Sequence, residues 1–182
     1  MLTAPNIISL VRLLLVPVMI YLLIDGRCGA ALAVFMFAAA SDVIDGFLAR
    51  RFNQQSYLGA VLDPAADKLM MVCTAVTLAA VKILPIWVAV AVVLRDVVIV
   101  LGFLAYRWLR GHVAMAPTLL GKLNTGLVFG VFTLVLANAA GIIDANAVLR
   151  ILYVVLVASI LASGLHYVWV WSVKAAHPER SS

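Results

Sequence analysis

Acidic residues are scarce in this 182-residue chain, which has seven aspartates and a single glutamate. Charged residues make up only 12% of it, hydrophobic residues make up 66%, and the mean hydropathy is +1.16. This composition excludes an ordinary soluble domain and predicts a polytopic membrane protein. The two cysteines, Cys28 and Cys73, have no metal-type spacing and no partner histidine. Their pattern argues against a zinc site and favours two buried, small hydrophobic residues.

The chain also has no internal repeat, no low-complexity tract and no linker. We therefore expect one domain over residues 1–182, with a short polar tail at 172–182. No basic stripe extends beyond the short loops, so we expect no nucleic-acid partner.

Six apolar stretches are each long enough to cross a bilayer, which takes about 20 residues in a helix. They cover residues 7–24, 29–49, 57–81, 84–106, 118–139 and 147–171. We predict an all-α protein with six transmembrane helices, which places both termini on the same side of the membrane.

The basic residues predict which side that is, because cytoplasmic loops carry an excess of Lys and Arg. Eight such residues lie at the end that holds the termini and three lie at the other end, while Lys68 and Arg95 fall inside the apolar stretches. The eight are Arg12, Arg50, Arg51, Arg107, Arg110, Lys122, Lys174 and Arg180, and the three are Arg27, Lys82 and Arg150. We expect a multi-pass protein of the cell (inner) membrane, with both termini in the cytoplasm.

Half of the acidic residues fall within one window, residues 42–67, which reads D-x2-D-G-x2-A-R-x8-G-x3-D-x3-D. Carboxylates at membrane depth are unfavourable unless they are paired, bound to metal or facing water, so this cluster predicts a functional site. Residues three or four apart share a face of a helix. Two aspartates therefore share one face in each of the two predicted helices, together with residues that have little or no side chain. The aspartates are Asp42, Asp45, Asp63 and Asp67, and the small residues are Gly46, Ala49 and Gly59.

Four carboxylates in one cleft repel one another, and divalent cations relieve this repulsion. All-oxygen ligands favour Mg²⁺ or Mn²⁺, and a pair of such ions suits displacement at phosphorus. The small residues would let a bulky ligand approach the backbone, and Arg50 could pair with a phosphate. The alternative is an ion or proton relay in a cation transporter, but a relay does not require Gly46, Ala49, Arg50 or Gly59 at fixed offsets.

The eight fixed positions of this window match the signature of the CDP-alcohol phosphatidyltransferases, and the chain resembles that family. The resemblance implies a six-helix membrane enzyme that forms homodimers and faces its active site to the cytoplasm. It also implies the reaction, in which an acceptor hydroxyl attacks the β-phosphate of a CDP-linked donor and CMP is released. The four aspartates would hold two metal ions, and Asp67 would also be the general base. Gly46, Ala49, Arg50 and Gly59 would bind the donor.

Two groups within the family are similar beyond the signature, namely the CMP-forming cardiolipin synthases and the phosphatidylglycerophosphate synthases. The opening APNIISLVRLLLVP, with Asn6 and Arg12, and the segment DPAADKL resemble both groups, which implies CDP-diacylglycerol as the donor. Residues 94–108 and 121–125 resemble the cardiolipin synthases somewhat more, since the other group more often has Glu at Asp96 and Lys at Asn124. We therefore favour phosphatidylglycerol as the acceptor, with glycerol 3-phosphate as the alternative.

Either acceptor carries a phosphate and calls for cations near the metal site, and Arg95 and Lys122 are the candidates. Arg95 could instead form a structural pair with Asp96 or with an aspartate of the signature, and Lys122 could simply mark the cytoplasmic side. Lys68 points about 100° away from Asp67 on a helix, so we expect it to meet a carboxylate or a lipid headgroup.

A further enzyme class, the intramembrane prenyltransferases, also binds pyrophosphate through aspartates. Six spans and the 18-residue separation of Asp45 and Asp63 argue against it.

Overall fold

The computed structural model describes the backbone of residues 4–52, 57–110 and 119–176, and the side chains of residues 10–41, 68–101, 121 and 123–164. Six α-helices and no strand make up these described segments, so the all-α prediction is confirmed. Each predicted stretch coincides with one helix to within five residues at either end. The helices are α1 (Ala4–Ile24), α2 (Cys28–Phe52), α3 (Tyr57–Ala80), α4 (Ile86–Arg110), α5 (Leu119–Ala139) and α6 (Asn146–Ala176).

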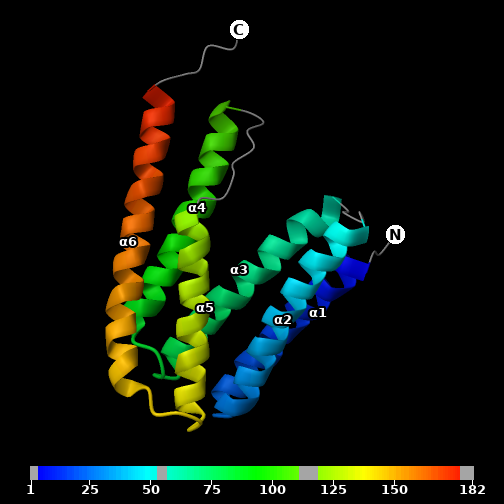
Figure 1. Cartoon of the computed structure of the whole chain (residues 1–182), viewed down its shortest axis with the longest axis vertical. Helices are drawn as coiled ribbons and strands as arrows, with labels where there is room; N and C mark the ends of the chain where they lie inside the picture. The colour runs from blue at the N-terminus through cyan, green and yellow to red at the C-terminus, as the bar shows by residue number, and fades with distance from the viewer. Residues whose placement is uncertain (1–3, 53–56, 111–118, 177–182) are drawn as a thin grey trace.

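The helices form two groups, α1 to α3 and α4 to α6, and α3 runs obliquely from the first group towards the second (Figure 1). Helix α1 packs against both α2 and α3, while α4 contacts α3 and α6, and α5 contacts α2 and α6. The connections α1–α2, α3–α4 and α5–α6 lie together at the lower end in Figure 1. The end of α2 and the start of α3, which carry the signature, lie away from them.

Three helices end in the same way at these connections. The second residue after the helix adopts a positive φ, at Gly26 (74°), Lys82 (61°) and Gly141 (71°). After α1, the Gly26 amide donates to the Leu23 carbonyl and the Arg27 amide donates to the Leu22 carbonyl. The same pair of bonds follows α3 and α5, and together they form the Schellman motif that closes a helix.

Apolar side chains join the two groups of helices. The Phe35 ring of α2 stacks on Phe129 of α5 with centroids 5.0 Å apart, and Phe132 completes the cluster. Between α4 and α6, Trp87 meets Tyr153 edge-on at 6.3 Å. The phenylalanine cluster therefore links the second group to α2, whereas the Trp87–Tyr153 contact holds α4 against α6 within the second group.

Large apolar side chains also cover the outside of all six helices. Leu14, Phe37, Val76, Leu94, Leu123 and Ile151 are each more than half exposed. Among the described side chains, one stretch, Asn146–Gly164 of α6, is both long and apolar enough to cross a membrane. Leu10–Ile24, Cys28–Ser41, Lys68–Ala80 and Leu123–Ala139 are apolar but shorter. Six helices are therefore confirmed in the described segments, and one of the six predicted spans, along α6, passes this test; the six-span arrangement stays a prediction.

Candidate functional site

The signature residues lie on two continuous helices. Asp42, Asp45, Gly46, Ala49 and Arg50 occupy the last three turns of α2, and Gly59, Asp63 and Asp67 occupy the first three turns of α3. Because both segments are helical, the spacings of three and four residues place each pair of aspartates on one helix face. The side chains of these eight residues lie outside the described ones, as does that of Lys122 in α5.

Helix α1 supplies a buried cation beside these two helices. Arg12 is only 2% exposed, and α1 packs against both α2 and α3. Arg12 lies within the first predicted span, 7–24, and its burial adds that its side chain faces the interior of the protein. A buried guanidinium needs polar or anionic partners, so Arg12 belongs to the polar interior of the protein. In the sequence, only the family resemblance of the opening segment singled out Arg12 as a residue of interest.

A described ion-pair cluster begins one residue after the signature. Lys68 of α3 donates from Nζ to Oδ1 of Asp96 on α4 at 2.6 Å. Arg95 donates from Nη1 to the same oxygen, also at 2.6 Å. The side chains of Arg95 and Asp96 are 7% and 8% exposed, and Lys68 is 38% exposed. The expectation that Lys68 meets a carboxylate is confirmed, and the carboxylate belongs to Asp96.

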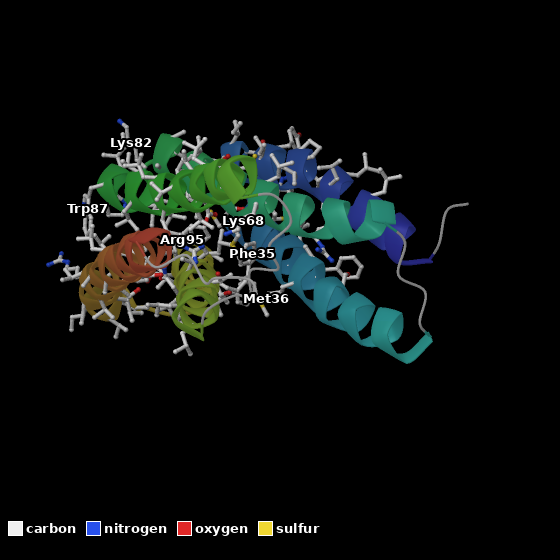
Figure 2. The ribbon with its side chains drawn as sticks, turned by 90° about the horizontal axis from the view of Figure 1, so that it is seen from above. Phe35, Met36, Lys68, Lys82, Trp87 and Arg95 are labelled. Atoms are coloured by element: carbon white, nitrogen blue, oxygen red, sulfur yellow. The ribbon has the colours of Figure 1, made fainter. Side chains whose placement is uncertain are left out.

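Arg95 also reaches across to α5. Its Nη2 donates to the Gly121 carbonyl at 3.3 Å and lies 3.5 Å from the Thr125 hydroxyl, which in turn donates to the same carbonyl at 3.0 Å. Figure 2 shows Lys68 and Arg95 in the interior among the helices, whereas Lys82 points outward. Of the two roles considered for Arg95, the structure shows the pair with Asp96. The ion pair with Asp96 uses Nη1 of Arg95, and Nε of Arg95 has no hydrogen-bond partner among the described residues.

Three buried donor groups near this cluster have no hydrogen-bond partner among the described residues. They are Nε of Arg95 on α4, Nδ2 of Asn124 on α5 and the hydroxyl of Ser163 on α6. Asn124 uses its oxygen to accept a hydrogen bond from Ser159, one turn before Ser163, at 2.9 Å. Sequence reasoning missed Ser159 and Ser163. The available signal was a pair of serines four residues apart within an apolar run.

Metal-ligand clusters of three or more His, Cys, Asp or Glu do not occur among the described side chains, which exclude the four signature aspartates. Those aspartates nevertheless supply the donor set expected for hard cations, since carboxylate oxygens suit Mg²⁺ and Mn²⁺. Both cysteines are free thiols; Cys28 is buried, as predicted, whereas Cys73 is only partly buried.

Comparison with known proteins identifies the family of this chain. The family model described as CDP-alcohol phosphatidyltransferase matches residues 2–162. A Streptomyces coelicolor protein named "Cardiolipin synthase (CMP-forming)" is 36% identical over 149 residues, which are 77% of this chain and 68% of that protein. The human protein of the same name is 34% identical over 141 residues, which are 69% of this chain and 47% of that protein.

A Mycobacterium tuberculosis protein is 38% identical over 139 residues, which are 75% of this chain and 66% of that protein. The matched region thus covers about two thirds of the bacterial relatives and about half of the human one. The match with the family model includes the whole signature window and five of the six helices in full. This chain belongs to the CDP-alcohol phosphatidyltransferase family.

Proposed function

We propose that this chain transfers a phosphatidyl group from CDP-diacylglycerol to the hydroxyl of phosphatidylglycerol, producing cardiolipin and releasing CMP. The observation that carries the proposal is the complete signature on two continuous helices, α2 and α3. Relatives whose names describe CMP-forming cardiolipin synthases support the choice of acceptor. Glycerol 3-phosphate is the alternative acceptor.

In this reaction the acceptor oxygen attacks the β-phosphorus of the donor, and the bond from that phosphorus to the oxygen of CMP breaks. Asp67 takes the proton of the acceptor hydroxyl. Gly46, Ala49 and Gly59 give the cytidine and phosphates room to approach the backbone, and Arg50 offsets phosphate charge. Arg95 and Lys122 serve the phosphate of the acceptor.

Asp42, Asp45, Asp63 and Asp67 would hold two Mg²⁺ or Mn²⁺ ions. When bound, these ions would offset the negative charge of the donor pyrophosphate. The aspartates' own contribution is to present oxygen ligands from two helices on the side of the protein where α2 ends and α3 begins.

The protein is expected to work as a homodimer in the cell (inner) membrane, with its termini and active site facing the cytoplasm. The exposed apolar side chains on all six helices support the membrane location, because soluble monomers rarely expose apolar patches of this extent.

The test is CMP release by the purified protein with CDP-diacylglycerol and Mg²⁺ or Mn²⁺, comparing two acceptors. Turnover with phosphatidylglycerol alone would support the proposal, and turnover with glycerol 3-phosphate alone would replace it by the alternative acceptor. Movement of Mg²⁺ into liposomes without CMP release would instead indicate a cation transporter.

A further inference from the structure

A groove between α4 and α6 combines an apolar wall with buried polar groups. Its volume is about 410 Å³, within the range of about 300–1,000 Å³ that is typical of ligand sites. Nine of its eleven lining residues are apolar or glycine, and the other two are Arg95 and Ser163. The lining residues on α4 run from Trp87 to Ile99, and those on α6 run from Ile160 to Gly164.

Among the described residues, the two polar residues of the groove each carry a donor without a partner. Taken as whole residues, Ser163 is 3% exposed and Arg95 is 9% exposed, and neither the Ser163 hydroxyl nor Nε of Arg95 meets a hydrogen-bond acceptor in the part of the chain that the structure describes. Burying such a group unpaired is unfavourable, and more so when it is charged. A ligand that presents acceptor oxygens would satisfy both groups.

The charge of the cluster favours an anionic ligand. Lys68 and Arg95 bind the same oxygen of Asp96, so these three residues carry one more positive charge than negative. Of the three residues only Arg95 lines the groove, while Lys68 lies beside it and is 38% exposed. A guanidinium N–H suits a phosphate oxygen, so Arg95 and Ser163 give the groove a donor-bearing part beside its apolar part.

The apolar part is open to the surroundings of the protein. Leu94, Val98 and Leu161 line it and are 57%, 45% and 62% exposed. From Trp87 to Arg95 the groove follows α4 for about 12 Å, at 1.5 Å per residue. One leaflet of the hydrocarbon core is about 15 Å deep, so this stretch takes most of the length of one acyl chain.

We propose that this groove binds one acyl chain of the acceptor phospholipid, with Arg95 and Ser163 donating to oxygens at its ester or phosphate end. The proposal rests on the proposed function and specifies its substrate class as a lipid rather than a water-soluble acceptor. The acceptor is favoured over the donor because the groove lies on α4 and α6, away from the signature of α2 and α3. It is also linked through Asp96 to Lys68, next to the expected base Asp67.

Gly164 offers a way to fill the groove without distorting the fold. It lines the groove, and a Cβ added there would meet no atom within 4 Å. Gly130 on α5 is equally open and does not line the groove, so Gly130→Leu is the matched control. We expect Gly164→Leu to raise the KM for long-chain phosphatidylglycerol by about tenfold, through lost apolar contact. Dihexanoyl phosphatidylglycerol should be affected much less, and Gly130→Leu should leave both values unchanged.

A second measurement needs no turnover. Phosphatidylglycerol with a diazirine on one acyl chain is photolysed with the full-length protein in nanodiscs, and the labelled peptides are identified. We expect the label on residues 86–101 and 146–164. It should be reduced in Gly164→Leu, and unlabelled phosphatidylglycerol should displace it better than CDP-diacylglycerol does.

The two measurements separate the two proposals. Label in the groove without CMP release from any acceptor would overturn the proposed reaction and keep the lipid site. Three results would overturn the proposal that the groove binds the acceptor. They are CMP release with phosphatidylglycerol but label elsewhere, displacement of the label mainly by CDP-diacylglycerol, and equal KM values in the two leucine variants.

Discussion

The signature aspartates are expected to act as a unit, because each supplies oxygens to the same pair of ions. Asp63→Asn and Asp67→Asn should each lower CMP release by at least about 100-fold, since a neutral amide neither offsets cation charge nor accepts the proton. Asp144→Asn is the control, because Asp144 is an exposed loop residue that accepts a hydrogen bond from Asn146. Circular dichroism and gel filtration would establish that all three variants are folded. Full activity in both signature variants would contradict the metal-site hypothesis.

Asp96 is the residue on which the cluster next to the signature depends. Replacing it by alanine leaves Arg95 buried without its carboxylate and removes the partner of Lys68. Breaking a buried pair in this way typically destabilises a protein by about 3–5 kcal/mol, so Asp96→Ala should clearly lower the unfolding temperature in detergent. Asp144→Ala, which removes an exposed carboxylate, should change it little. Equal unfolding temperatures for the two variants would show that the cluster contributes little to stability.

Single residues also show where sequence reasoning reached its limit. The window 42–67 predicted the candidate site because helical spacing alone places the aspartates on common faces. Whether Arg95 pairs with Asp96 could not be decided, since that depends on how α3 and α5 pack against α4 and bring Lys68 and Gly121 to it. The burial of Arg12, within the first predicted span, could not be predicted for the same reason, because hydropathy does not tell which side of a helix faces its neighbours.

At the scale of the elements, helix length was predictable because apolar runs of about 20 residues dominate the chain. The helix ends are set by local backbone conformation, and the C-terminal end of α3 is unusual. Lys82 adopts φ 61° where α1 and α5 have glycine. An L-residue in this conformation is disfavoured by about 1–2 kcal/mol, so Lys82→Gly should raise the unfolding temperature. Lys82→Ala retains the Cβ and should not raise it, and an equal gain in both variants would contradict the explanation.

At the scale of the whole molecule, the six-span topology predicts that the connections α1–α2, α3–α4 and α5–α6 face the outside of the cell, and that the connection α2–α3 faces the cytoplasm. In a variant with Cys28 and Cys73 replaced by alanine, a cysteine at Asp144 should react with a membrane-impermeant maleimide from the outside of intact cells. A cysteine at Gln54, between the two halves of the signature, should react only from the cytoplasmic side. Labelling of both from the same side would contradict the six-span topology.

The central claim is metal-dependent phosphatidyl transfer, and the most direct test is the stoichiometry of the reaction. Purified protein in liposomes of phosphatidylglycerol and CDP-diacylglycerol would be assayed for CMP and for cardiolipin, with Mg²⁺ or Mn²⁺ and again with EDTA. We predict equal amounts of CMP and cardiolipin. Both products should form only when the metal is present, and Asp67→Asn should form neither. CMP formation that is unaffected by EDTA, or no CMP with any metal and acceptor, would contradict it.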